Sequence, residues 1–270
     1  MSGHSSGSSS HLDLAGLTLD GLTPDGLTPD GLAPDPAGVE DLPAAVAAYL
    51  EAIFELDEDD ITAVQVRIAE RMGVSRPAVS EMVRKLRRRG LVVVEGGQVR
   101  LTATGLEHAE RRVRRHRIAE RFLTDVLGLG WAQAHAEAEA WERVMNARTE
   151  AAMSAVLGDP TTCPHGNPIP GSAWTDPNAV PLDEVAIGGS FKVVRITEQL
   201  EFVPGMLEAL ELAGLQPEVR GRLVSTSPDG SFAVEIVDDG DTRRPLALAG
   251  ATAERILVHP EPLATGGATE

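Results

Sequence analysis

The sequence predicts a mainly α-helical protein with a small β domain towards its C-terminal end. Apolar residues recur at helical spacing from residue 43 to about 157, which predicts successive amphipathic helices. Strand-like segments separated by short turns fill residues 188–262. At 270 residues the chain is longer than one hydrophobic core usually serves, so we expect more than one domain.

Composition narrows the class of protein. The single cysteine excludes a disulfide framework and favours a cytoplasmic location. No segment approaches the roughly 18 apolar residues of a membrane span, and no basic segment followed by an apolar one opens the chain. Neither an H-E-x-x-H motif nor a P-loop occurs. We therefore expect a cytoplasmic protein that does not contact membranes, is not an enzyme and needs no organic cofactor.

The charge is distributed unevenly along the chain. With 24 basic and 41 acidic residues the net charge is −17, which by itself argues against nucleic-acid binding. Residues 1–59 hold twelve of the acids and no lysine or arginine. Residues 60–100, however, hold nine bases and four acids, and 111–121 hold six arginines and one acid. A basic segment therefore lies inside an acidic chain.

Residues 1–40 have the composition of a disordered tail. After a Ser-, Gly- and His-rich opening they contain a five-residue repeat, DGLTPDGLTPDGLAPD at 20–35. Proline at every fifth position excludes a helix, and the segment has no aromatic residue to build a core. The regularly spaced leucines leave a second interpretation open, in which the repeat is a docking strip for a partner. We expect a second disordered tail at 263–270.

Two amphipathic helices are expected after the tail. The first begins near Pro43, and a second periodic segment over 62–72 ends at Gly73, a typical C-terminal residue of a helix. The apolar stripe of the first helix consists of Val46, Tyr49, Leu50, Ile53, Phe54 and Leu56.

A basic helix and a hairpin follow. Ser75 is typical of an N-cap, Pro77 suits the first turn, and the helix is expected to run through Arg89 and stop at Gly90. The sequence LVVVEGGQVRLT at 91–102 predicts a strand, a Gly-Gly turn and a second strand. Helix, turn, helix and hairpin in this order describe a winged helix-turn-helix.

The basic helix carries the residues expected to contact DNA. In helix-turn-helix proteins the leading residues of the second helix reach base edges, and basic residues behind them contact phosphates. The first group is Ser75, Arg76, Pro77, Ala78 and Glu81, and the second is Arg84, Lys85 and Arg88. The alternative is a solvated basic helix face with no ligand. Cap, proline, basic helix and wing occur together, which favours binding to double-stranded DNA.

Two further helices, 103–125 and about 131–157, carry candidate metal ligands. His116 and Glu120 share one helix face, as do His135, Glu139 and Glu142. If the two helices pack together, two imidazoles and three carboxylates meet. The alternative for each pair is an ion pair on a helix surface. Imidazole and carboxylate without thiolate suit Mn²⁺ or Fe²⁺ better than structural zinc.

The remaining chain is expected to form a linker and a β domain. Residues 158–188 are rich in proline and glycine. After them, GGSFKVVRITE predicts a strand, EALELAG a short helix, and RGRLVSTS, SFAVEIVD and RPLALA three more strands.

The chain resembles the diphtheria-toxin-repressor family of metal-dependent regulators. VRIAERMGVSRPAVSEMVRKLRRRGLV is similar to its recognition segment, RRHRIAERFLTD and HAEAEAWERVM to its dimerisation and metal-binding helices, and CPHGNPIPG to its hinge signature. VRITEQLE is similar to the start of its SH3-like third domain. The resemblance implies a homodimer that binds a palindromic operator and represses metal-homeostasis genes when loaded with Mn²⁺ or Fe²⁺.

Together, the pattern and the resemblance predict six segments. They are the tail at 1–40, the winged helix-turn-helix at 41–110, the helical dimerisation and metal-binding domain at 111–160, the linker at 161–187, the SH3-like β-barrel domain at 188–262, and the tail at 263–270.

The resemblance also implies two metal sites. The family's ancillary site takes ligands from both dimerisation helices and from the third domain. Carried over position by position, it corresponds to His116, Glu120, His135, Glu198 and Glu201.

The family's primary site is altered in this sequence. Its positions hold Ala48, Glu139, Glu142 and Arg143, and Glu51 matches a further carboxylate of the manganese-responsive branch. Arginine cannot become a ligand by losing a proton. In one hypothesis Arg143 replaces the cation and pairs with the carboxylates. In the other, Arg143 faces solvent and a reduced Mn²⁺ site forms from Glu51, Glu139, Glu142 and His116.

Two further positions affect the expected function. Glu81 stands where the family has glutamine, and a carboxylate accepts a hydrogen bond from cytosine N4 but donates none, so we expect an altered operator. Cys163 and His165 lie in the hinge signature and are expected to form a structural turn. The alternative functions are a winged-helix regulator that no longer depends on metal at the primary site, and a metal-storage or adaptor protein without specific DNA binding.

Overall fold

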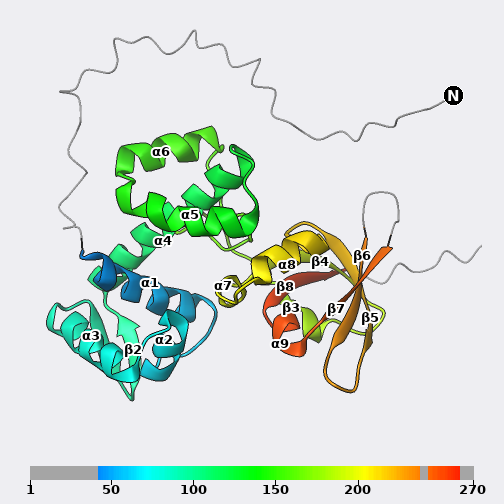
Figure 1. Ribbon diagram of the computed structural model, residues 1–270, viewed down its shortest axis with the longest axis horizontal. Coiled ribbons are helices and arrows are strands. Elements are labelled where there is room, and N and C mark those ends of the chain that lie inside the picture. The colour runs from blue at the N-terminus through cyan, green and yellow to red at the C-terminus, as the bar shows by residue number, and fades with distance from the viewer. Residues whose placement is uncertain (1–41, 238–242, 262–270) are drawn as a thin grey trace, which may run out of the picture. The chain divides into compact units, whose positions relative to one another are not determined.

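The computed structural model describes residues 42–237 and 243–261, and helices precede a C-terminal antiparallel sheet (Figure 1). The predicted fold class is confirmed. The two tails predicted at 1–40 and 263–270 lie outside the described residues. None of the helices in the described ranges is both long and apolar enough to cross a membrane.

The first elements form the predicted winged helix-turn-helix. They are α1 (Ala44–Glu58), α2 (Gln65–Met72), α3 (Arg76–Arg88), β1 (Val92–Glu95) and β2 (Gln98–Leu101). Gly73 ends α2 in the left-handed conformation, with φ 62°. Ser75 caps α3, because its Oγ accepts a hydrogen bond from the Ala78 amide at 3.4 Å. The apolar stripe of α1 packs on the buried faces of α2 and α3 and on the hairpin, which forms one core.

The segment expected to serve dimerisation contains three helices. They are α4 (Ala103–Asp125), α5 (Trp131–Val144) and α6 (Ala147–Val156). The single helix expected over 131–157 is wrong, because Met145 is extended, with ψ 124°, and Asn146 caps a new helix by accepting from the Thr149 amide at 3.0 Å. Helix α4 also runs unbroken through residue 110, where the sequence suggested a domain boundary, so both segments share it.

The segment expected as a linker folds into a tight, buried loop at 161–169. Cys163, His165 and Asn167 are completely buried, and the Cys163 amide donates to the Asn167 carbonyl oxygen at 2.8 Å. Gly166 has φ 89°, and a Cβ there would lie 2.1 Å from the Val194 carbonyl oxygen. Only glycine therefore allows the loop to lie this close to the third domain.

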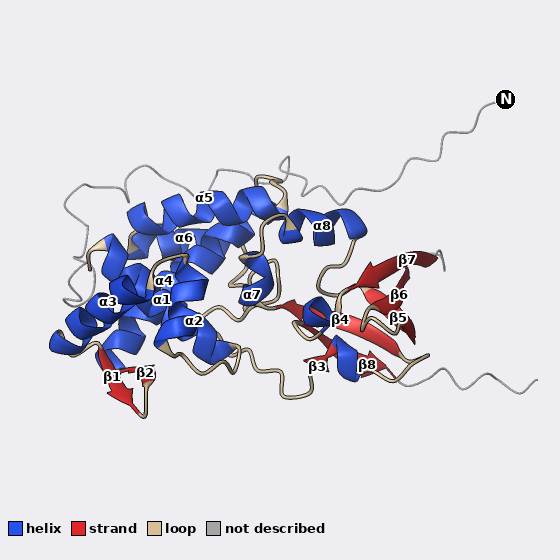
Figure 2. Cartoon of the chain, turned by 60° about the horizontal axis from the view of Figure 1, so that its bottom comes forward, coloured by secondary structure: helices blue, strands red, loops and turns tan. Residues whose placement is uncertain are grey.

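The third domain is a six-stranded sheet with short helices (Figure 2). Its strands are β3 (Val180–Pro181), β4 (Ser190–Ile196), β5 (Arg220–Thr226), β6 (Phe232–Val237), β7 (Arg243–Leu248) and β8 (Ile256–Glu261). Their order in the sheet is β3-β8-β4-β5-β6-β7, all antiparallel. The 3₁₀ turn η5 (Leu182–Glu184) and helices α7 (Glu198–Glu201), α8 (Met206–Ala213) and α9 (Gly250–Ala253) complete it. The sequence pattern did not reveal β3, η5, α7, α9 or β8, which are short or irregular.

Candidate metal centre and nucleic-acid interface

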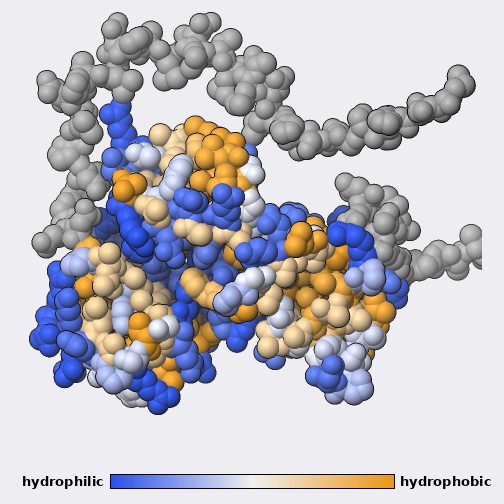
Figure 3. Space-filling view, in the orientation of Figure 1, coloured by the Kyte–Doolittle hydropathy of each residue, from blue (hydrophilic) through white to orange (hydrophobic). Residues whose placement is uncertain are grey.

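Helix α3 presents its polar residues to solvent and its apolar residues to the core. Val79, Val83 and Leu86 are buried at spacings of three and four residues. All residues predicted to contact DNA are exposed, namely Ser75, Arg76, Pro77, Ala78, Glu81, Arg84, Lys85 and Arg88. In Figure 3 hydrophilic residues line the left edge of this part of the molecule, next to apolar residues on the face towards the viewer. The arrangement is that of a helix free to enter a groove of DNA.

Helices α4 and α5 bring the first three candidate ligands together. Glu120 Oε1 lies 3.2 Å from His116 Nε2 and 2.8 Å from His135 Nδ1. The two imidazole nitrogens are 3.4 Å apart. The three ligand atoms lie within 4.8 Å of one another, a spacing that suits one metal ion.

The third domain and the buried loop complete this cluster. Glu201 of α7 places Oε2 3.2 Å from His135 Nδ1 and Oε1 3.1 Å from His165 Nδ1. The Cys163 Sγ lies 3.8 Å from the same nitrogen of His165. Glu120, Cys163 and His165 form a second group with ligand spacing. We define the candidate metal centre, called the metal centre below, as His116, Glu120, His135, Cys163, His165 and Glu201.

Cys163 and His165 were expected to form a structural turn. They do form a tight loop, but the loop also turns both side chains towards Glu120 and Glu201. The available signal in the sequence was the Cys-x-His spacing itself, and it became informative only when the loop was seen against α4 and α7.

Glu198, the remaining residue of the predicted ancillary set, has a different partner. Its Oε1 accepts hydrogen bonds from Arg117, at 2.7 Å from Nη2 and 3.2 Å from Nε. Arg117 is fully buried and also donates from Nη2 to Glu58 Oε2 at the end of α1, at 2.6 Å. Glu198 therefore does not join the cluster. Through Arg117 it connects α7 to Glu58 at the end of α1.

Buried charges in the centre neutralise one another. Burial lowers the pKa of His135, but hydrogen bonds to Glu120 and Glu201 outweigh it and raise that pKa to about 10. The pKa values of His116 and His165 are likewise raised against the effect of burial. Burial raises the pKa of Glu201, yet the histidines hold it at about 2. The carboxylates are therefore ionised, and a cation can replace the histidine protons.

The donor types of this cluster support a ligand role. The ring nitrogen of His165 that faces the other donors is Nδ1, 3.1 Å from Glu201 Oε1 and 3.8 Å from Cys163 Sγ. Imidazole, carboxylate and thiol donors in one place fit a divalent transition metal.

A second group lies beside the first, at the positions of the altered primary site. Glu51 of α1, His116 and Glu142 have ligand atoms within 4.8 Å of one another. The Arg112 guanidinium lies between the carboxylates, with Nε 2.6 Å from Glu51 Oε2 and Nη2 paired with Glu142 Oε1.

Arg143 takes no part in this group. Its side chain is 52% exposed, and its Nη2 lies 3.4 Å from Glu139 Oε2 on the surface of α5. The hypothesis that Arg143 replaces the primary cation does not describe this arrangement, because the helix directs residues 139 and 143 towards solvent while Arg112 occupies the position. Ala48 lines the cavity beside the group but offers no ligand atom.

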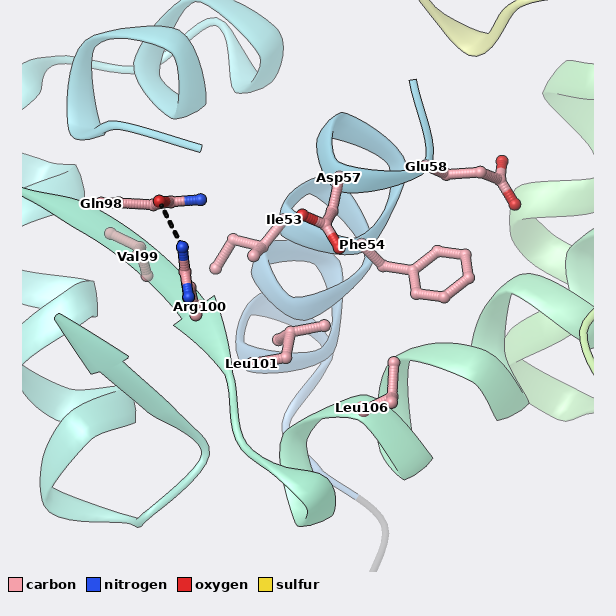
Figure 4. Close-up of a pocket in the computed structure, with 9 residues that line it drawn as sticks. All are labelled: Ile53, Phe54, Asp57, Glu58, Gln98, Val99, Arg100, Leu101 and Leu106. Atoms are coloured by element: carbon pink, nitrogen blue, oxygen red, sulfur yellow. Dashed lines mark hydrogen bonds between the residues drawn. The ribbon is translucent and has the colours of Figure 1, made fainter. Parts of the chain in front are cut away.

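A larger pocket of about 480 Å³ lies between α1, β2 and α4 (Figure 4). Its walls combine apolar side chains such as Ile53 and Leu106 with Asp57 and Glu58. The nine lining residues include no histidine or cysteine, so this pocket is separate from the metal centre.

Known proteins match both the sequence and the fold. Two family models of iron-dependent repressors match the chain. The model of the N-terminal DNA-binding domain matches residues 41–98, and the model of the metal-binding and dimerisation domain matches residues 102–171. The iron-dependent repressor IdeR of Mycobacterium tuberculosis is 36% identical over 225 residues, which cover 79% of this chain and 97% of that protein. The chain belongs to the diphtheria-toxin-repressor family. The family resemblance and the function of a metal-dependent transcriptional repressor are thereby confirmed.

Other relatives of this repressor include a toxin repressor and a manganese-dependent repressor. The diphtheria toxin repressor of Corynebacterium diphtheriae is 39% identical over 207 residues, covering 74% of this chain and 87% of that protein. A solved manganese-dependent transcriptional repressor in complex with manganese has a TM-score of 0.70 at 34% identity, covering 80% of this chain and 100% of the other.

The matched segments place most of the metal centre in the repressor's metal-binding domain. His116, Glu120, His135, Cys163 and His165 all lie within 102–171. Glu201 lies beyond it, in the third domain, so the centre joins two parts of the repressor.

Proposed function

We propose that this repressor binds Mn²⁺ or Fe²⁺ at the metal centre and then binds its operator as a homodimer. The observation that carries the proposal is the meeting of three imidazoles and two carboxylates from α4, α5, the 161–169 loop and α7 in one buried place. The nitrogen and oxygen donors suit both metals. Iron-dependent and manganese-dependent relatives agree with that choice.

The chain's own residues connect the centre to the DNA-binding segment. When bound, the metal supplies the positive charge that holds the carboxylates of α4 and α7 together. Glu201 and Glu198 share the four-residue helix α7, and Glu198 pairs with Arg117, which also holds Glu58 of α1. In addition, Arg195 Nη2 donates to Asp59 Oδ1 at 2.6 Å. Metal binding at α7 therefore fixes α1, on which α2 and α3 pack.

We propose that helix α3 reads the operator. Its leading residues, including Glu81, face base edges, and Arg84, Lys85 and Arg88 contact phosphates. A homodimer places two such helices on two half-sites, which favours a palindromic operator. The Glu81 carboxylate favours a cytosine at the base that it meets.

The dimerisation face is proposed to lie on α5 and α6. Apolar residues gather over this part of the molecule, at the top of Figure 3. Exposed apolar side chains of this segment are Val144 at the end of α5, Val156 at the end of α6, and Val126 and Leu127 between α4 and α5. An exposed apolar patch of this kind marks an interface.

The test is DNA binding with and without metal. Operators are selected from random duplexes in the presence of Mn²⁺ or Fe²⁺, and affinity is measured by fluorescence anisotropy. The proposal expects at least about a tenfold loss of affinity in EDTA and its recovery on adding metal, the size of a typical coupling between sites. Unchanged affinity in EDTA would identify a metal-independent regulator, and no selected sequence would identify a storage or adaptor protein. In the same assay Glu81→Gln should change the preferred base at one operator position. The expected change in binding free energy between the two bases is about 1–3 kcal/mol.

A further inference from the structure

The group beside the metal centre already contains a cation from the chain itself. Arg112 reaches from α4 to Glu51 on α1 and to Glu142 on α5, so one guanidinium joins three helices. The exposed fractions of these side chains are 15% for Arg112, 15% for Glu51 and 1% for Glu142. The second carboxylate oxygen of Glu142 lies 3.0 Å from His116 Nδ1.

The carboxylates need a positive charge between them. Burial raises the pKa of Glu51, Glu142 raises it further, and Arg112 acts in the opposite direction. Two buried carboxylates this close repel each other unless a cation or a proton separates them. In this repressor the guanidinium fills that role with a charge-assisted hydrogen bond to Glu51 and an ion pair with Glu142.

A divalent metal does not fit the group as it stands. A guanidinium has no lone pair to offer a metal, and it stays protonated at any ordinary pH. It also occupies one oxygen of each carboxylate. A metal ion placed there would meet a positive charge at hydrogen-bond distance from its own ligands.

The neighbouring side chains leave space for Arg112, and neither Ala48 nor Arg143 supplies a cation to the group. Ala48 is too short to reach the group, and a cavity of about 190 Å³ remains beside Glu51, Arg112 and His116. Arg143 also lines this cavity, but its side chain is 52% exposed and its ion pair is with Glu139 on the same helix. The cation therefore comes from α4.

We propose that Arg112 is a resident cation that replaces the metal of the family's primary site and joins the DNA-binding segment to α4 and α5 without metal. This inference rests on the proposed function, because it assigns all metal dependence to the other centre. The repressor then takes up one regulatory ion per chain. Removing Arg112 leaves the carboxylates of Glu51 and Glu142 free to hold a second ion.

The experiment measures bound Mn²⁺ per chain, by elemental analysis after equilibrium dialysis of the full chain. Wild type is expected to bind one ion, and Arg112→Met, which removes the charge and keeps the volume, is expected to bind two. Arg143→Met is the matched control, since it removes an exposed arginine from α5, and it should bind one. Arg112→Lys keeps a cation in place and should also bind one.

The outcomes separate this inference from the proposed function. Two ions in wild type that fall to one in Glu51→Gln, or one ion in folded Arg112→Met, would overturn the resident-cation role. If the metal centre itself fails, wild type binds no ion while Arg112→Met binds one. Should Arg112→Met not fold, Glu51→Gln decides the question: one ion per chain supports the inference, whereas a drop from two ions to one shows that Glu51 is a ligand.

Discussion

At the scale of single residues, His165 links the two carboxylates of the metal centre. Its Nδ1 lies 3.1 Å from Glu201 Oε1 and 3.8 Å from Glu120 Oε1. The residue is completely buried, so it interacts with the interior alone. Its place in the cluster makes it a sensitive probe of the metal.

His165→Ala is expected to lower the affinity for Mn²⁺ by at least about tenfold, the loss that even supporting groups of metal sites usually cause. The affinity is measured by competition with a fluorescent chelator. His259→Ala is the matched control, because His259 pairs with Asp176 at 2.8 Å and lies outside the metal centre. Equal affinities of the two variants would contradict a ligand role for His165.

The protonation of His135 predicts how metal binding varies with pH. Its pKa is raised from 6.5 to about 10 in the metal-free fold. Its contribution to stability is therefore complete below pH 6.5 and is lost as the pH rises towards 10. A metal ion must displace the proton, so metal affinity rises across the same interval, by up to about tenfold per pH unit for each proton released.

Two measurements check this pH dependence. The melting temperature of the metal-free chain should fall between pH 6.5 and 9, and Mn²⁺ affinity should rise over the same range. Affinity that stays constant over this range would contradict the displacement of a proton. A flat melting temperature would show that His135 is not held protonated by Glu120 and Glu201.

At the scale of elements, the 161–169 loop and α7 decide the composition of the centre. The loop carries Cys163 and His165, and Asn167 anchors it by donating from Nδ2 to Glu201 Oε1 at 2.6 Å and to the Ile196 carbonyl oxygen at 3.0 Å. The prolines and glycines of this segment suggested a linker, because composition reports turns but not burial. Its real constraint is the contact of Gly166 with β4.

Gly166→Ala is expected to destabilise the fold by more than about 1 kcal/mol, since it combines a positive φ with an overlap against the Val194 carbonyl oxygen. Mn²⁺ affinity should fall with it. Gly128→Ala is the matched control, because Gly128 has a φ of 73° but open space around its Cα. Denaturant unfolding compares the two. Equal losses would attribute the effect to φ alone and contradict the close approach.

At the scale of the whole molecule, the net charge of −17 argues against DNA binding, but the distribution of the charges along the chain favours it. Twelve of the acids lie in residues 1–59, whereas α3 presents basic residues to solvent. The apolar face on α5 and α6 is the proposed dimer interface, and a dimer is needed to place two recognition helices on one operator.

Val144→Lys combined with Val156→Lys is expected to convert the dimer into a monomer and to weaken operator binding by at least about tenfold, because each half-site would then be bound separately. Val144 is 82% exposed and Val156 67%. Light scattering after gel filtration measures the mass. Leu212→Lys, at an 84% exposed position on α8, is the control and should stay dimeric. A double variant that remains a dimer would place the interface elsewhere.

The sequence by itself determined the helices of the DNA-binding segment, α4, the wing, the family and most candidate ligands of this repressor. Those features follow from local rules: the 3.6-residue period of α1, the cap at Ser75, and the i, i+4 spacing of His116 and Glu120. The tertiary structure alone decided that Arg112 holds Glu51 and Glu142, that Glu198 pairs with Arg117, and that His165 joins the metal centre. Each of these contacts links residues at least 30 positions apart. Side-chain partners over such separations depend on how the elements pack, and no local pattern in the sequence records that packing.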